Sequence, residues 1–198
     1  MEVHDVEHQR VLCDGWRIRV ASEVNRSGTE VSSPDAEVRD WIPAAVPGTV
    51  LAALAAHGTY PDPYSGLNLK GIPREPFERP WWYRTEFTLS ERNTSGTVLL
   101  EFDGINYAGE IWVNGVRIAA ANEARGAYRR FQYDISRSVA EGRNVLAVEV
   151  TPPAPGDFST GFADWNPPAP DRNMGLFRPV RLRFCDGVSI EDPFVETR

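Results

Sequence analysis

The chain has 198 residues, a net charge of −7 at pH 7, 41% hydrophobic residues and 25% charged residues. This length suits one domain with a sizeable core, and an acidic surface without a long block of one charge argues against nucleic acid as the main partner. No apolar run approaches a membrane span and the N-terminal stretch MEVHDVEHQR lacks the apolar core of a signal peptide, so we expect no membrane partner and a cytoplasmic protein, unless a leader has been cut away.

The first elements along the chain are a strand and a short helix. Residues 15–22 (GWRIRVAS) alternate apolar and polar side chains, which predicts a half-buried strand. After a Pro-Gly break, Thr49 is placed to cap a helix over residues 50–57, which Gly58 ends. This is the only convincing helix in the sequence.

A long proline-containing segment follows the helix. Residues 60–80 (YPDPYSGLNLKGIPREPFERP) predict an irregular loop, and their tyrosine and phenylalanine content argues against disorder. Asn68 and Lys70 in this loop could reach a ligand, or they could be solvated loop residues. The next residues, Trp81 and Trp82, could form a stacking surface, but neighbours in a strand face opposite sides, so we expect at least one of them in the core.

The remaining chain is rich in strand signals. Segments with alternating apolar side chains cover residues 81–89, 97–105, 109–120, 128–136, 144–152 and 179–185. Asn114-Gly115 is the pair that a two-residue type I′ hairpin turn prefers, because both positions need positive φ. Sixteen prolines, sixteen glycines and six tryptophans also favour turns and large aromatic anchors. We therefore expect an all-β fold, an antiparallel jelly-roll β-sandwich of about eight strands with one short helix.

The loop over residues 153–178 contains the most suggestive group of side chains, Asp164, Trp165 and Asn166. A carboxylate accepts hydrogen bonds from two sugar hydroxyls, an amide both donates and accepts, and an indole stacks on the C–H face of a pyranose. The alternative is a structural turn, in which the Asp and Asn side chains cap the backbone and the Trp packs on the core.

Other chemistry is not apparent in the sequence. There is no glycine-rich phosphate loop, no nucleophile elbow, no metal-ligand pattern and no recognisable acid–base carboxylate pair. We therefore expect no catalytic residue, no metal and no cofactor in this chain. Cys13 and Cys185 are either two free thiols or, because first and last strands often neighbour each other in sandwiches, a bridge between those strands.

Several blocks resemble, in order, the N-terminal sugar-binding domain of glycoside hydrolase family 2. They are VPGTVLAALAAHGTYPDPYSGLN, PWWYRTEF, LLEFDGINYAGEIWVNGVRI, YRRFQYDIS, GRNVLAVEVTPP and DRNMGLFRPVRL. The segments YPDPYSGLN and DWNPPAPDRNMGLFRPV are most similar to the exo-β-D-glucosaminidase, β-mannosidase and endo-β-mannosidase branches. The resemblance extends from Trp16 to about Phe184.

The resemblance implies a domain organisation. It implies one galactose-binding-domain-like jelly roll over residues 1–198, with a core over about 11–186. The catalytic glutamates of the family lie on a (β/α)₈ barrel, which is absent from this chain. The chain is then a non-catalytic part of a retaining β-glycosidase, and that barrel is its partner within the parent chain.

The resemblance also implies roles for the loop residues. The loop before the last strand reaches the barrel mouth in this family, so Asp164 would contact hydroxyls of the terminal sugar of a β-linked oligosaccharide, with Trp165 and Asn166 beside it. Asn68 matches a sugar-contacting asparagine of β-galactosidases in placement, although the surrounding loop differs. Mannose and glucosamine both remain open, and the acidic charge balance is compatible with a cationic glucosamine.

Two other functions compete with a sugar-binding accessory domain. A free-standing carbohydrate-binding module should carry an exposed aromatic patch and bind sugar alone. A purely structural buttress for the barrel should bury Trp165 and Asp164 within its own loop.

Overall fold

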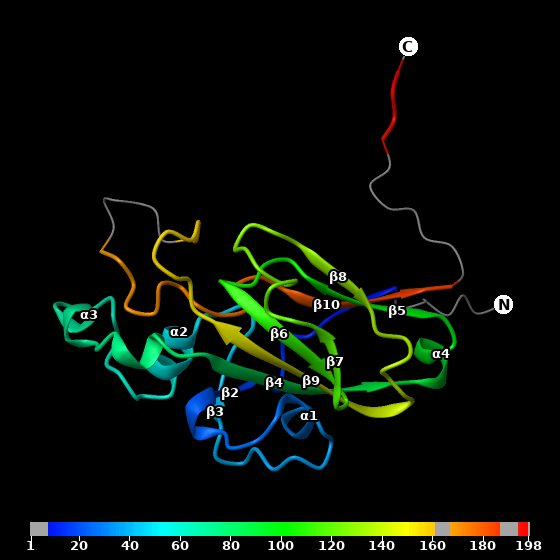
Figure 1. Ribbon diagram of the computed structural model, residues 1–198, viewed down its shortest axis with the longest axis horizontal. Coiled ribbons are helices and arrows are strands. Elements are labelled where there is room, and N and C mark those ends of the chain that lie inside the picture. The colour runs from blue at the N-terminus through cyan, green and yellow to red at the C-terminus, as the bar shows by residue number, and fades with distance from the viewer. Residues whose placement is uncertain (1–7, 161–166, 187–193, 198) are drawn as a thin grey trace.

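Two antiparallel β-sheets form the frame of the computed structural model, which describes residues 8–160, 167–186 and 194–197 (Figure 1). Within this described part the strands are β1 (Gln9–Val11), β2 (Arg17–Val20), β3 (Ile42–Pro43), β4 (Trp81–Leu89), β5 (Thr97–Phe102), β6 (Ala108–Val113), β7 (Val116–Ala119), β8 (Phe131–Asp134), β9 (Gly142–Thr151) and β10 (Val180–Cys185). One sheet has the strand order β1-β10-β5-β8, and the other has the order β3-β2-β4-β9-β6-β7. The predicted all-β sandwich is confirmed.

The helices are short. They are α1 (Gly28–Val31), α2 (Val50–Ala56), α3 (Asn68–Gly71) and α4 (Glu91–Thr94), with the 3₁₀ turns η1 (Ala21–Glu23) and η2 (Glu75–Phe77). The predicted helix is α2, and the hydroxyl of Thr49 accepts a hydrogen bond from the backbone N–H of Ala52, at 3.2 Å. The other α-helices are single turns, too short for the apolar periodicity that reveals a helix in a sequence.

Alternation along β4 shows how the sheets enclose the core. Tyr83, Phe87 and Leu89 are buried on the side that faces the four-stranded sheet, while Glu86 and Thr88 are exposed on the other side. β9 pairs with β4 along the whole length of β4. Each fully buried large apolar side chain stabilises the fold by roughly 1.5–3 kcal/mol, so this inner face is the main source of stability.

Trp81 and Trp82 are both buried, on opposite faces of β4. Trp81 belongs to the core between the sheets, whereas Trp82 packs with Val31 and Trp41 in a second apolar cluster. The chain between β2 and β3, residues 21–41, covers the outer face of the six-stranded sheet there. The covering segment buries Trp82 and the core between the sheets buries Trp81, so neither tryptophan is available as a stacking surface.

The strand register decides the state of the two cysteines. The strand expected to be first, residues 15–22, is β2 and lies in the other sheet from β10, whose neighbour is β1, a strand that the sequence did not predict. Val11 of β1 pairs with Arg181, so Cys13 lies beyond the start of β10 and Cys185 lies at its end. A separation of about six strand positions amounts to about 20 Å, several times the Cα distance that a disulfide spans. Both thiols are free, and the bridge is not formed.

Two further observations concern the turn between β6 and β7 and the length of the helices. Asn114 and Gly115 have φ of 48° and 83°, as the predicted type I′ turn between β6 and β7 requires. No helix in the described ranges is both long enough and apolar enough to span a membrane.

Candidate functional site at the loop end of the sandwich

The predicted sugar-binding loop belongs to the end of the sandwich that carries α2 and α3. Figure 1 shows the orange segment at 167–178 beside these helices, while α4 lies at the opposite end. Asp164, Trp165 and Asn166 lie outside the described residues. The described flanks of the loop, residues 153–160 and 167–178, show how the fold holds it.

The start of α2 and the residues just before it bind the second flank, residues 167–178. The backbone N–H of Gly48 donates to the carbonyl oxygen of Leu176, and that of Val50 donates to the carbonyl oxygen of Met174, both at 2.9 Å. The N–H of Leu51 donates to a carboxylate oxygen of Asp171 at 3.0 Å. The N–H groups at a helix start have no partner inside the helix, so these bonds satisfy donors that the fold would otherwise leave open.

Asp171 is a buried carboxylate with a structural role. Besides Leu51, it accepts the backbone N–H of Asn173 at 2.9 Å, which closes a tight turn. Burial raises the pKa of Asp171, and the hydrogen bonds from Leu51, Thr49 and Asn173 oppose that rise. Because its oxygens are used inside the fold, Asp171 is a support for the loop and not a group that meets a ligand.

Asn106 connects the two flanks. Its side-chain Nδ2 donates to Thr160 Oγ1 at 3.2 Å, to the carbonyl oxygen of Arg172 at 2.9 Å and to that of Asn173 at 2.8 Å. Its backbone N–H and carbonyl both bond to Gly175, at 3.0 and 2.7 Å. The residue is completely buried, and its Oδ1 has no hydrogen-bond partner among the described residues. One amide therefore fixes residue 160 relative to residues 172–175.

Gly175 allows the flank to approach the sheet. Its φ is +148°, and a Cβ there would lie 2.5 Å from Tyr83 Oη and 2.6 Å from the carbonyl oxygen of Gly48. Both distances are shorter than any real contact of a Cβ, and Gly48 offers a backbone atom that cannot turn aside. Glycine is the residue that this approach requires.

Exposed aromatic rings accompany the first flank. Tyr128 and Phe158 are 54% and 70% exposed, and their ring centroids are 5.2 Å apart with a 43° tilt. Beside them Arg125 lies over the ring of Tyr107 at 5.2 Å and forms an ion pair with Asp157 at 2.7 Å. The backbone N–H of Ala154, followed by Arg125, lowers the pKa of Asp157, so this carboxylate is charged and the patch is ordered by its own contacts.

Asn68 is described, and its amide serves its own loop. It is the first residue of α3, is half-buried, and donates from Nδ2 to the carbonyl oxygen of Asp62 at 3.0 Å. Lys70 is exposed. Among the described residues no hydrogen bond joins Asn68 to the flanks of the 153–178 loop. The structure places Asn68 at the same end as the loop without showing that they form one site.

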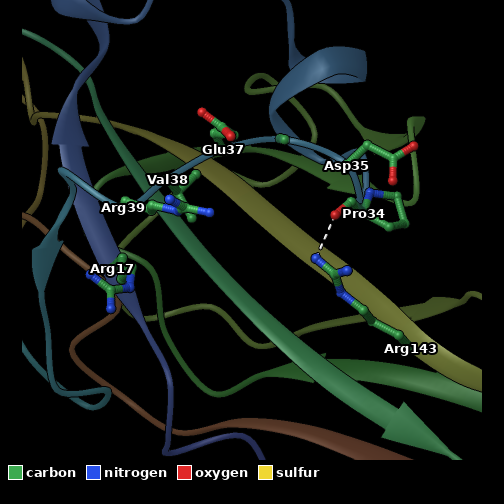
Figure 2. Close-up of a pocket in the computed structure, with 8 residues that line it drawn as sticks. Arg17, Pro34, Asp35, Glu37, Val38, Arg39 and Arg143 are labelled. Carbon is green, nitrogen blue, oxygen red and sulfur yellow. Dashed lines mark hydrogen bonds between the residues drawn. The ribbon is translucent and has the colours of Figure 1, made fainter.

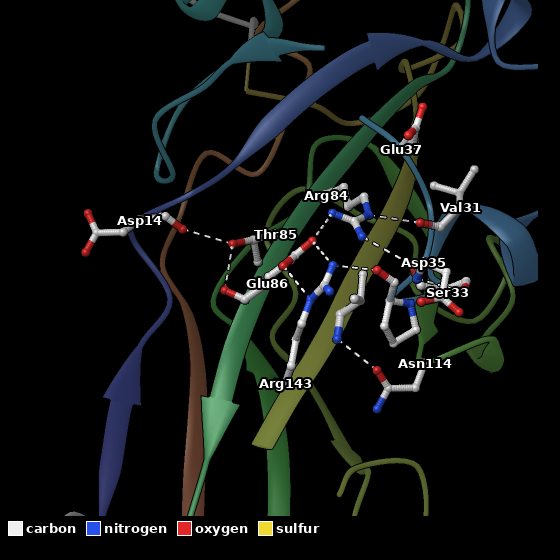
Figure 3. Close-up of polar contacts among 12 residues, drawn as sticks. Asp14, Val31, Ser33, Asp35, Glu37, Arg84, Thr85, Glu86, Asn114 and Arg143 are labelled. Atoms are coloured by element: carbon white, nitrogen blue, oxygen red, sulfur yellow. Dashed lines mark hydrogen bonds and ion pairs between the residues drawn. The ribbon is translucent and has the colours of Figure 1, made fainter. Parts of the chain in front are cut away.

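A shallow hollow on the outer face of the six-stranded sheet is a separate candidate. Arg17, Arg143 and residues 34–39 line its volume of about 380 Å³ (Figure 2). Figure 3 shows Glu86 between two guanidinium groups: Arg84 and Arg143 each approach it to 2.8 Å. Arg143, ahead of Arg84, lowers the pKa of Glu86.

The same two arginines attach the covering segment to the sheet. Arg84, which is buried, donates to the carbonyl oxygens of Val31 and Ser33 at 3.0 and 3.2 Å, and Arg143 donates to that of Pro34. Their donors are used on backbone carbonyls and on one carboxylate. We therefore interpret this hollow as the seam of the covering segment and not as a binding site.

The part of the chain that the structure describes contains no group of three potential metal ligands. The residues that sequence reasoning missed are Asn106, Asp171 and the aromatic patch at Tyr128 and Phe158. The first two stand inside the blocks GINYAGE and DRNMG, where no periodicity marks them. The patch draws its rings from segments 30 residues apart, and only the fold brings these together.

Comparison with known proteins identifies a family and several relatives of this chain. Residues 16–157 match the model of the family described as "Glycosyl hydrolase 2 galactose-binding domain-like". An exo-β-D-glucosaminidase of Streptomyces avermitilis is 39% identical over 185 residues, which are 93% of this chain and 20% of the relative. A mannosylglycoprotein endo-β-mannosidase of Lilium longiflorum is 32% identical over 214 residues, covering 93% of this chain and 22% of the relative.

Solved structures agree with the sequence relatives. The exo-chitosanase CsxA of Amycolatopsis orientalis superposes with a TM-score of 0.82 at 34% identity, over 89% of this chain and 20% of that one. A β-D-mannosidase of Dictyoglomus thermophilum gives 0.68 at 22% identity over 89% of this chain and 22% of that one, which shows the shared fold alone. The chain spans about a fifth of the length of these relatives.

Proposed function

The chain belongs to the family of glycosyl hydrolase 2 galactose-binding-like domains, and from this premise we propose that it is the non-catalytic, sugar-binding accessory domain of a retaining β-glycosidase. The parent acts on β-linked glucosamine in this proposal, because several relatives are named exo-β-D-glucosaminidases; a β-mannosidase is the other branch. Bond cleavage belongs to a barrel domain elsewhere in the parent, and this domain closes one side of the sugar pocket.

The observation that supports the proposal is the anchoring of both flanks of the 153–178 loop. Surface loops are usually the most mobile parts of a fold. Here a buried amide, Asn106, and a buried carboxylate, Asp171, hold the two flanks at defined places. Burying such polar groups is costly unless their hydrogen bonds are made. Here those hydrogen bonds are made to the two flanks, so the buried polar groups fix the position of this loop.

Within the loop, Asp164 is the proposed hydrogen-bond acceptor for hydroxyls of the terminal sugar. Trp165 offers a ring for the sugar's C–H face, and Asn166 offers an amide that both donates and accepts. Asn68 has the smaller role, because its Nδ2 is engaged with Asp62 and its Oδ1 is the atom left to accept from a hydroxyl.

Kinetics of the full-length parent test this proposal. Wild type and Asp164→Ala are compared on an aryl β-glucosaminide, an aryl β-mannoside and chitosan oligomers, with Asp35→Ala, an exposed aspartate on the covering segment, as the matched control. We expect Asp164→Ala to lower kcat/KM on the order of a hundredfold, ~3 kcal/mol of transition-state binding, and the control to leave it unchanged. Unchanged kinetics for both variants would leave the domain a buttress for the barrel.

A free-standing carbohydrate-binding module is the second candidate, and the exposed pair Tyr128 and Phe158 favours it. Exposed rings beside a loop are what a module needs to bind sugar without a barrel. Titration of the 198-residue chain with chitosan oligomers separates the two functions. Binding that weakens in Phe158→Ala and not in Asp164→Ala would favour the module.

A further inference from the structure

The turn that leads into α3 presents two large apolar side chains to solvent. Tyr64 is 97% exposed, and Leu67, three residues later, is 73% exposed. Single exposed apolar side chains are ordinary on a protein surface, whereas neighbouring ones mark a surface that meets a partner. We call Tyr64 and Leu67 the α3-loop pair.

The backbone that carries the α3-loop pair is held by hydrogen bonds within its own turn. The carboxylate Oδ1 of Asp62 accepts the backbone N–H of Tyr64 at 2.9 Å. The carbonyl oxygen of Asp62 accepts the N–H of Ser65 at 3.2 Å and Nδ2 of Asn68 at 3.0 Å. Because the turn is already ordered, little conformational entropy of the backbone is lost when a partner covers it.

The chemistry of the α3-loop pair fits a protein surface better than a sugar. Leu67 has no flat ring on which the C–H face of a pyranose could stack, and sugar hydroxyls need polar partners beside such a ring. The polar side chains of this turn, Asp62 and Asn68, make their hydrogen bonds inside the turn. A tyrosine and a leucine together instead match an apolar protein surface with a polar rim, where the tyrosine hydroxyl finds a partner.

The position of the α3-loop pair indicates which protein surface this is. α3 lies at the same end of the sandwich as the 153–178 loop (Figure 1). The chain spans about a fifth of its relatives, so about four fifths of such a relative lies outside the matched part. In the proposed function this end of the sandwich faces the barrel domain. Contacts between domains of one chain bury roughly 600–1,500 Å² and are partly polar, so two apolar side chains are anchors of a larger contact.

We propose that Tyr64 and Leu67 dock against an apolar surface on the remainder of the parent chain. The inference rests on the proposed function for the existence of that remainder. It adds a contact between domains that is formed by the α3 loop and not by the 153–178 loop. Its direct consequence is that both side chains are covered in the parent, although they are exposed in the 198-residue chain.

Hydroxyl-radical footprinting with mass spectrometry tests that consequence on unaltered proteins. The rates of oxidation of Tyr64 and Leu67 are compared between the 198-residue chain and the full-length parent. We expect both rates to fall about tenfold or more in the parent, because the anchors of a contact are fully desolvated. Val116 on β7 is 49% exposed and lies away from α3 (Figure 1), so its rate should be the same in both proteins.

Paired variants test whether the contact stabilises the parent. Tyr64→Ser with Leu67→Ser should leave the urea midpoint of the 198-residue chain unchanged, because exposed side chains contribute little to the stability of the isolated fold. In the parent the same pair should lower, by several degrees, the temperature at which half of the activity is lost. Val11→Thr with Val116→Thr also replaces two exposed apolar side chains and should lower neither quantity.

Four results would overturn the proposal. They are equal oxidation of the α3-loop pair in both proteins, equal slowing at Val116, protection in the 198-residue chain that grows with its concentration, and protection of that chain by chitosan oligomers. The third result would assign the surface to a second copy of the chain, and the fourth would assign it to sugar. The Asp164 proposal is decided separately by kinetics of the parent, so Asp164→Ala without a kinetic effect would remove the clamp and leave the oxidation rates of the α3-loop pair as they are.

Discussion

Replacing Asn106 by alanine tests whether one buried amide holds the loop end together. The change removes the donors to the carbonyl oxygens of Arg172 and Asn173 and to the hydroxyl of Thr160. A buried acceptor left without a partner costs about 1–3 kcal/mol. Two carbonyls would lose this donor, at about 1.5–2 kcal/mol each because Arg172 and Asn173 are not fully buried, while removal of the Asn106 Oδ1, which has no partner among the described residues, returns about 1 kcal/mol. We therefore expect a net loss of about 2–3 kcal/mol in the free energy of unfolding.

Urea unfolding followed by tryptophan fluorescence measures that loss, and a fall in Tm of about 4–12 °C should accompany it for a chain of this size. Asn68→Ala is the matched control, since this half-buried asparagine donates one side-chain hydrogen bond, to Asp62. It should cost no more than about 1 kcal/mol. Asn106→Asp keeps the size and places a carboxylate against two carbonyl oxygens, so it should be at least as harmful as alanine. The reasoning is refuted if Asn106→Ala costs no more than Asn68→Ala, or if Asn106→Asp is tolerated.

Two further predictions concern the supports of the sandwich. Gly175→Ala should destabilise the chain by roughly 3 kcal/mol or more, because its Cβ would collide with Tyr83 Oη and the Gly48 carbonyl; urea unfolding measures this, and a near-neutral effect would contradict it. Glu86→Gln should lower the free energy of unfolding at neutral pH, and the difference between wild type and variant should disappear at acidic pH. Arg143 holds the folded pKa of Glu86 below its ordinary value of 4.5, so its contribution is present above that pH and is lost as the pH falls through the lower folded pKa. A difference in stability that does not shrink as the pH falls below 4.5 would show that charge is not the cause.

The longer strands were predictable because their signals are local, whereas the short strands β1 and β3 were not predicted. β4 begins and ends where alternation predicts it, and the turn at Asn114-Gly115 needs only the φ preferences of two adjacent residues. The covering segment at 21–41 was not predictable. Its attachment depends on Arg84 and Arg143, whose partners in that segment lie 51 to 109 residues away along the chain. Without it, the burial of Trp82 could not be foreseen.

The candidate site shows the same limit more sharply. The sequence directs attention to side chains with obvious ligand chemistry, such as Asn68, whose Nδ2 turns out to serve its own loop. Asn106 and Asp171 have the same residue types as many surface positions. Apart from the local bond between Asp171 and Asn173, the partners of their side chains are at least 54 residues away in the sequence, and these distant partners make them important. Long-range hydrogen bonds leave no pattern in a single sequence.

Substitution of Asn106, which anchors the loop, distinguishes a sugar-binding loop from a structural buttress when its effect on catalysis is measured. Its effect on stability alone does not distinguish them. If Asn106 acts on catalysis by placing the loop that bears Asp164, the two residues act as one unit. The free-energy effects of substituting residues that act as one unit are not additive. In the parent enzyme Asn106→Ala should then lower kcat/KM, and should lower it further only slightly when Asp164 is already alanine. If the domain is a buttress, Asn106→Ala reduces the fraction of folded enzyme and leaves kcat/KM per folded molecule unchanged. The double-mutant cycle therefore distinguishes a loop that is held in place for its side chains from a loop that is held in place for the fold.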